Sequence, residues 1–83
     1  MNKNLAQILG LAYAAQVMGQ GSVTNVTSQF VQVAKKDASL LAEARAELSR
    51  TQNVDPKQCF ASAQVAKFLQ QALTQVDNAN PSP

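Results

Sequence analysis

The stretch DPKQCFASAQVAKFLQQALTQV, residues 55–76, contains the clearest helix signal in the chain. It opens with an acceptor side chain at Asp55, followed by Pro56 at the first helical position and Gln58 at the third. This order is typical of a helix N-terminus. The missing N–H of proline would have no partner there, and a glutamine at the third position can complete a capping box. We therefore predict a helix from Asp55 to about Val76 or Asp77.

The same segment has an apolar stripe at helical spacing, about 100° per residue. Its members, which we expect to face inward, are Cys59, Ser62, Val65, Ala66, Leu69, Ala72, Leu73 and Val76. Phe60 and Phe68 fall outside this stripe, on a face that is rich in glutamine. Either the N-terminal helix covers these two side chains, or they belong to a partner or self-association surface, where aromatic residues are enriched.

The preceding segment, about residues 24–50, is also predicted to be helical, although its Val/Thr-rich start is poor helix material. Its apolar positions recur on one face of ~120°, and they are Val26, Phe30, Val33, Ala34, Leu40, Leu41, Ala44 and Leu48. Asp37 falls near the centre of this face. Either Asp37 caps a new helix that starts at Ala38, or it points into an interface and pairs with a cation.

The N-terminal segment, about Asn4 to Met18, predicts a helix that is apolar on nearly every side, with Gln7 and Gln16 as its polar points. We expect residues 19–22, Gly-Gln-Gly-Ser, to end it. A helix of this kind needs cover on more than one side. One half of it carries Leu5, Ile8, Leu9, Leu11, Ala12, Ala15 and Met18; the other carries Ala6, Gly10, Tyr13, Ala14 and Val17. Gly10 and Ala14 permit close approach of another helix, which belongs either to this chain or to another molecule.

The fold that these segments predict is an all-α bundle of three helices, or of four if the second segment breaks near Asp37. We expect one helical domain over residues 1–77 and a C-terminal tail without regular structure over residues 78–83, which are rich in Asn, Pro and Ser. A chain of 83 residues buries only ~60–65% of its unfolded surface. Cys59 is the only cysteine and there is no histidine. Disulfides and Cys/His zinc sites are therefore excluded, which leaves oligomerisation or a bound partner to complete the core.

The sequence contains no constellation for catalysis or metal binding. General base chemistry most often uses histidine, which is absent. Glu43 and Glu47 lie four residues apart on a solvated face, but no third ligand is near them in the sequence. Cys59 lies on the apolar stripe, where an inert buried thiol is expected. We therefore expect no enzyme activity, no catalytic residue, no metal, no cofactor and no small-molecule substrate.

Charge and hydropathy argue against two further classes of partner. Charged residues make up 14% of the chain, the formal net charge is +2, and the cations are dispersed rather than clustered as in nucleic-acid binders. The first helix lacks the Lys/Arg-rich polar face of a helix that lies on a membrane. The apolar run from Leu5 to Leu11 is interrupted by Gln7 and is shorter than a secretory signal. We expect a location in the cytoplasm or within an assembled particle.

These observations favour a non-enzymatic structural protein that works by helical self-association or by packing into a larger particle, such as that of a phage or virus. The residues expected at its partner interface are Gly10, Tyr13, Ala14, Val17, Phe60 and Phe68. Two alternatives stay open. One is a small regulatory adaptor or inhibitor that binds a single protein; the other is a nucleic-acid-associated module that uses Lys35, Lys36 and Arg45 or Arg50.

Overall fold

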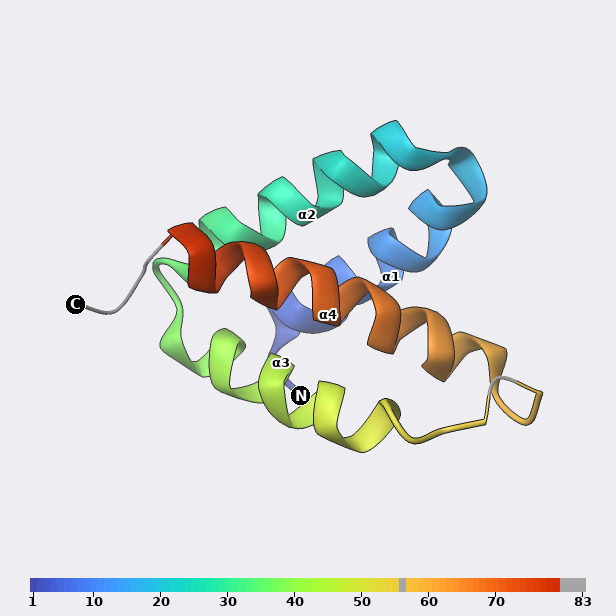
Figure 1. Cartoon of the computed structure of the whole chain (residues 1–83). Helices are drawn as coiled ribbons and strands as arrows, with labels where there is room; N and C mark the ends of the chain where they lie inside the picture. Colours follow the sequence, from blue (N-terminus) through green and yellow to red (C-terminus); the bar gives the residue numbers. More distant parts are fainter. Residues whose placement is uncertain (56, 80–83) are drawn as a thin grey trace.

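A computed structural model describes residues 1–55 and 57–79, and in them the chain folds as four helices. These are α1 (Lys3–Met18), α2 (Gln20–Ala34), α3 (Ala38–Thr51) and α4 (Phe60–Ala79). The prediction of an all-α fold is confirmed, in its four-helix form. α1 packs mainly on α2 and α3 mainly on α4, so the bundle consists of two helical hairpins (Figure 1). α4 also packs along α2, which joins one hairpin to the other.

The connection between α1 and α2 is a single residue, Gly19. The backbone there has φ 122° and ψ 173°, a conformation that only glycine adopts without strain. α1 ends at Met18 with Gly19 as its C-cap, as predicted, but the next helix starts earlier than the predicted start near residue 24. α2 already starts at Gln20, because one residue with positive φ is enough to reverse the chain.

Asp37 ends the connection between α2 and α3. Its Oδ1 accepts a hydrogen bond from the backbone N–H of Leu40 at 3.1 Å, which caps α3. Its Oδ2 accepts from the side-chain amide of Asn2 at 3.1 Å. These donors, the Leu40 N–H foremost, lower the pKa of the Asp37 carboxyl. The local-cap alternative is therefore confirmed, and the alternative of an interfacial ion pair is wrong.

The last helix starts later and ends later than predicted. Asp55 Oδ1 accepts from the Lys57 N–H at 3.0 Å, and its carbonyl oxygen accepts from Gln58 and Cys59, so Asp55 organises a turn before the helix. α4 begins at Phe60, and the position predicted for Pro56 lies outside the described residues. α4 continues to Ala79, two residues into the expected tail, and residues 80–83 lie outside the described part of the chain.

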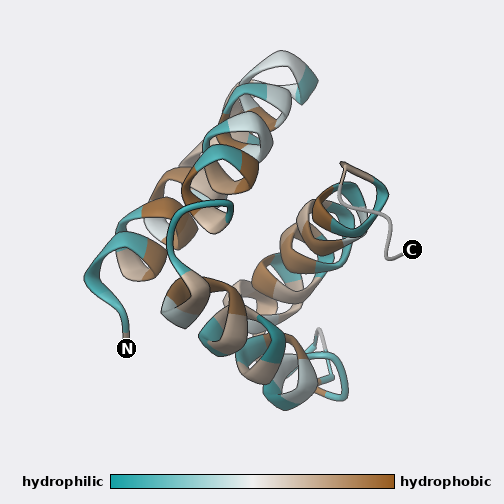
Figure 2. Ribbon diagram, turned by 90° about the vertical axis from the view of Figure 1, so that its left-hand side faces the viewer, coloured by the Kyte–Doolittle hydropathy of each residue, from teal (hydrophilic) through white to brown (hydrophobic). Residues whose placement is uncertain are grey.

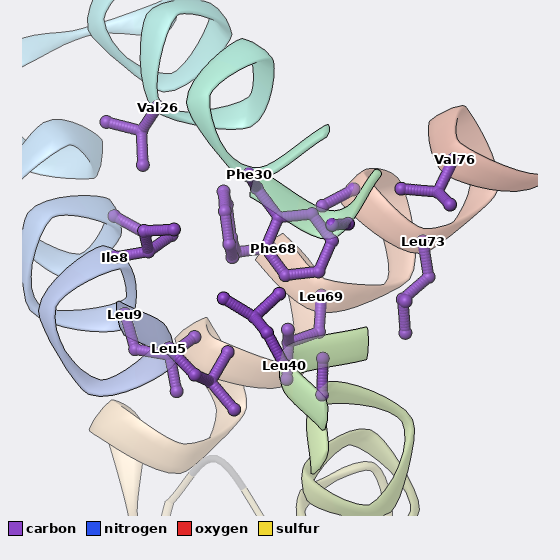
Figure 3. Packing of buried hydrophobic residues seen from close by; sticks show 14 of the residues in the cluster. Leu5, Ile8, Leu9, Val26, Phe30, Leu40, Phe68, Leu69, Leu73 and Val76 are labelled. Carbon is purple, nitrogen blue, oxygen red and sulfur yellow. The ribbon is translucent and has the colours of Figure 1, made fainter. Parts of the chain in front are cut away.

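All four helices contribute to one apolar core, and in Figure 2 their hydrophobic residues lie mostly toward the space between them. The rings of Phe30 on α2 and Phe68 on α4 meet edge to face at its centre, with centroids 6.0 Å apart (Figure 3). The buried apolar side chains are Leu5, Ile8, Leu9, Ala12, Ala15, Val26, Phe30, Ala34, Leu40, Ala44, Phe68, Leu69, Ala72, Leu73 and Val76.

The inward stripe predicted for the last helix is confirmed only in its C-terminal half. Leu69, Ala72, Leu73 and Val76 are buried, whereas Ser62, Val65 and Ala66 are half-buried. The prediction that Cys59 is a buried thiol is wrong, since its side chain is exposed. On α1, the half that carries Leu5, Ile8, Leu9, Ala12 and Ala15 is buried, whereas Leu11 and Met18 of the same half are exposed. These deviations lie away from the centre of the bundle, where fewer helices are available to cover a side chain.

Candidate contact site

Three large exposed apolar side chains gather around one groove. Tyr13 and Val17 come from the second half of α1, and Phe60 is the first residue of α4; their side chains are 44%, 85% and 60% exposed. The groove has a volume of about 350 Å³ and lies between α1, the start of α2 and the first half of α4. We call it the α1–α4 groove. Its lining residues are Tyr13, Gln16, Val17, Gly19, Gln20, Val23, Phe60, Gln64, Lys67, Phe68 and Gln71.

Phe68 forms the floor of this groove rather than its rim. Its side chain is only 1% exposed because its ring packs against Phe30. The expectation of a surface-exposed Phe68 is therefore wrong. A helical wheel drawn from the sequence places Phe68 off the apolar stripe because such a wheel assumes that the helix has a single buried face. α4 is instead packed between α2 and α3 and also contacts α1, which widens its buried face.

Gly10 and Ala14 lie on α1 outside the α1–α4 groove, and both are exposed. A Cβ placed on Gly10 would meet no atom within 4 Å. The small residues therefore do not fit beneath another helix of this chain, and that alternative is wrong. Their use in an intermolecular contact stays a prediction.

Gln16, which lines the α1–α4 groove, has a buried side-chain oxygen without a hydrogen-bond partner. Gln16 donates from Nε2 to the backbone carbonyl of Gln64 at 3.2 Å, and this bond fixes the orientation of its amide. Its Oε1 is then left buried and without a hydrogen-bond partner among the described residues. A buried acceptor without a donor costs about 1–3 kcal/mol. Sequence reasoning did not name Gln16 as an interface residue, although its position as a polar point on an otherwise apolar helix was the available signal.

A second groove lies on the α1–α2 hairpin. It involves the first half of α1 and the second half of α2, and Leu11, which is 45% exposed, is part of its wall. The remaining lining residues are Asn4, Gln7, Ile8, Ser28, Gln29, Gln32 and Val33. The α1–α2 hairpin therefore contributes to the α1–α4 groove, and it forms the second groove alone.

The charged residues are distributed unevenly between the two hairpins. Residues 4–34 contain no Asp, Glu, Lys or Arg. Arg45 on α3 pairs with Asp77 on α4 at 2.7 Å, and Arg50 pairs with Glu47 within α3. Arg45 and Arg50, either of which a nucleic-acid-associated module would use, therefore each have an acidic partner. Lys67 is the only charged residue among those that line the α1–α4 groove.

The titratable side chains do not converge on a reaction centre. Glu43 accepts hydrogen bonds from the Asn2 N–H at 2.9 Å and the Ser39 hydroxyl at 3.2 Å. In residues 1–55 and 57–79, no group of three or more His, Cys, Asp or Glu side chains is placed to hold a metal ion. Cys59 lies 3.1 Å from the Ser62 hydroxyl, and hydrogen bonding by Ser62 lowers the pKa of the thiol. No second titratable side chain completes a catalytic pair with it in the described structure.

The described residues form a small all-α fold with an exposed groove, in whose lining Lys67 is the one charged residue. The chain shows no significant similarity to a known protein family, to a curated protein or to a solved structure. None of the helices in the described part of the chain is both long enough and apolar enough to cross a bilayer.

Proposed function

We propose that this protein is a non-enzymatic assembly protein, which associates with further copies of itself or packs as a subunit into a larger particle. The observation that supports this most is the clustering of Tyr13, Val17 and Phe60 around one groove. Single exposed apolar residues are common on any surface, but a cluster of them around a concavity is typical of an interaction site.

The energetic argument is the apolar surface that the isolated chain leaves in water. Fully burying a side chain such as Val or Phe contributes about 1.5–3 kcal/mol relative to leaving it exposed. A partner that covers the α1–α4 groove would recover part of this free energy for Val17 and Phe60.

The charge distribution favours copies of the same chain as partners. In a symmetric interface, each surface meets an identical one, so like charges face each other. The region between Asn4 and Ala34 has no charged side chain, and it can therefore approach its own copy without this repulsion. A standard interface covers ~800 Å² on each partner, a modest fraction of the 5302 Å² of this chain.

Solution mass tests the proposal. We expect light scattering to report a mass above the 8.8 kDa of one chain, rising with concentration. Added salt should weaken the association little, because apolar contacts are not screened. A strict monomer up to the millimolar range, where even a weak dimer would populate, would contradict self-association.

The alternative of an adaptor that binds one other protein is supported by the polar part of the same groove. Gln16, Gln64 and Gln71 could hydrogen-bond a dissimilar partner. In that case the chain is monomeric by light scattering, and it captures a single protein that the variant Phe60→Asp no longer captures. Phe60 is the appropriate site for this variant because it is exposed, whereas a charge at Phe68 would disrupt the core.

A further inference from the structure

We infer that the first two turns of α4, residues 60–67, open and close as a unit while the rest of the bundle stays folded, and that the release of Gln16 favours this opening. We call these two turns the opening segment. Opening is a property of the single chain, so it does not depend on the proposed self-association.

The two halves of α4 are anchored unequally in the core. The second half contributes large buried side chains (Figure 3), those of Phe68, Leu69, Leu73 and Val76. In the opening segment the large apolar side chains are Phe60, which is 60% exposed, and Val65, which is half-buried. None of the described residues between Thr51 and Phe68 is buried. Because hydrophobic stabilisation grows with the apolar area buried, the opening segment gains little from docking.

The polar contact of the opening segment carries a cost of its own. In the described structure one hydrogen bond joins this segment to another helix, from Gln16 Nε2 to the backbone carbonyl of Gln64 at 3.2 Å. It leaves Gln16 Oε1 buried and unpaired. A buried acceptor without a donor costs more than an ordinary hydrogen bond contributes in net free energy. The contact therefore favours separation of α1 from the opening segment, because water reaches Oε1 once they part.

The chain before α4 allows the opening to begin there. Asp55, Lys57 and Cys59 are exposed, so this part of the chain can move without uncovering core residues of its own. The Ala63 N–H donates to the Cys59 carbonyl at 3.2 Å as the helical ladder begins. A helix can lose its first turns and keep the rest of its ladder, since each bond is added to those already formed. Segments with few buried apolar contacts are the ones that open at low free energy.

Opening removes one wall of the α1–α4 groove. Phe60, Gln64 and Lys67 belong to the opening segment, whereas Tyr13 and Val17 belong to α1. The groove is therefore complete only in the closed state. A partner that contacts both walls binds this state alone, and its apparent affinity falls with the fraction of molecules that are open. Binding of such a partner would in turn hold the opening segment closed.

Hydrogen exchange measured residue by residue by NMR tests the inference, in dilute protein so that association adds no protection. The N–H groups of residues 64–67 bond within the opening segment, and those of residues 73–76 bond within the second half of α4. After correction for intrinsic rates, we expect residues 64–67 to exchange at least ~100-fold faster than residues 73–76. Equal protection of the two sets would mean that α4 opens only as a whole, which would overturn the inference.

The start of α3 is the control for ordinary fraying of a helix end. Residues 42–45 occupy the same positions relative to the start of α3 as residues 64–67 do in α4. Leu40, however, is fully buried in the first turn of α3. We expect residues 42–45 to exchange as slowly as residues 73–76. If they exchange as fast as residues 64–67, the opening segment is not a distinct unit and the inference is wrong.

The variant Gln16→Met tests the role of Gln16, with Gln7→Met as its matched control. Both replace a glutamine of α1 by an unbranched side chain, but Gln7 is exposed and lies in the second groove. Methionine has no amide oxygen to leave unpaired, so we expect Gln16→Met to slow the exchange of residues 64–67 about 3- to 10-fold. Gln7→Met should leave this exchange unchanged, and circular dichroism should show equal helicity for both variants. Faster exchange of residues 64–67 in Gln16→Met, or slowing confined to residues 73–76, would show that release of Gln16 does not favour the opening.

Discussion

The α1–α2 hairpin and the α3–α4 hairpin contribute to the same core but differ in their outer surfaces. The α3–α4 hairpin carries both side-chain ion pairs of the described structure, and its charged residues Arg45, Arg50, Lys67 and Asp77 are exposed. The α1–α2 hairpin has no charge after Lys3, and it carries Leu11, Tyr13, Val17 and Met18 in exposed positions. Under the proposed function, the α3–α4 hairpin faces solvent, and the α1–α2 hairpin provides much of the surface that a partner covers.

The largest expected loss of stability follows from removing a contact that joins the two hairpins. Phe68 packs edge to face on Phe30 at the centre of the core. We expect Phe68→Ala to lower the free energy of unfolding by about 3–5 kcal/mol, a large part of the ~5–15 kcal/mol of a small domain. Urea denaturation followed by circular dichroism measures this loss.

Leu11→Ala is the control for Phe68→Ala, because Leu11 is on the uncharged hairpin and partly exposed. It should cost no more than about 1 kcal/mol in the monomer. If Phe68→Ala also costs less than this, Phe68 is not at the junction that the structure shows. Should Phe68→Ala fail to fold, the milder Phe68→Leu should still show a larger loss than Leu11→Ala.

Replacing two glycines of the α1–α2 hairpin by alanine should change the stability by smaller amounts, and in opposite directions. Gly19→Ala forces a side chain into a backbone conformation with φ 122° and should destabilise the protein by about 1–3 kcal/mol. Gly10→Ala should instead stabilise it by about 0.5–1 kcal/mol, since Gly10 is helical and a Cβ there has free space. Thermal unfolding measures both. A stabilising Gly19→Ala would mean that the hairpin turn is not the one described.

The smallest expected effect is a pH dependence that originates at the start of the charged hairpin. The pKa of Asp37 is lowered in the folded protein by the Leu40 N–H and the Asn2 amide. The stability that this provides is fully present above the unfolded pKa of the carboxyl and is lost as pH falls through the lower, folded pKa. As pH falls below the unfolded pKa of ~4, wild-type Tm should therefore drop more steeply than the Tm of Asp37→Asn, which keeps a capping side chain without the titration. Parallel curves for the two proteins would contradict this role.

The parts of the fold that sequence reasoning found are those with a local cause. The helical spacing of Leu69, Ala72, Leu73 and Val76 predicts a buried face whichever helix packs against it. The side chain of Asp37 caps a helix through the backbone N–H of Leu40, only three residues further along the chain. Four of the six predicted interface residues line one groove: Tyr13, Val17 and Phe60 are exposed there, and Phe68 is buried as its floor. They were recognisable because apolar side chains off the main stripe have no cover within their own helix.

The parts that sequence reasoning missed depend on tertiary packing. Phe68 is buried because α2 and α3 both pack on α4, and a single helical wheel does not contain this information. Cys59 lies before the first turn of α4, so an inward position on the wheel does not bury it. The unpaired state of Gln16 Oε1 arises from its contact with a residue 48 positions away, and no spacing rule reports such a contact.

The one-residue link at Gly19 has a consequence for how the chain folds. Helices joined by so short a connection meet at almost no cost in loop closure, and contacts between neighbours in sequence are the ones that form fastest. We therefore expect the α1–α2 hairpin to assemble early, and during synthesis it leaves the ribosome ahead of α3 and α4. The uncharged hairpin would then fold ahead of the charged one, and its exposed apolar side chains would meet other chains while α3 and α4 are still unfolded.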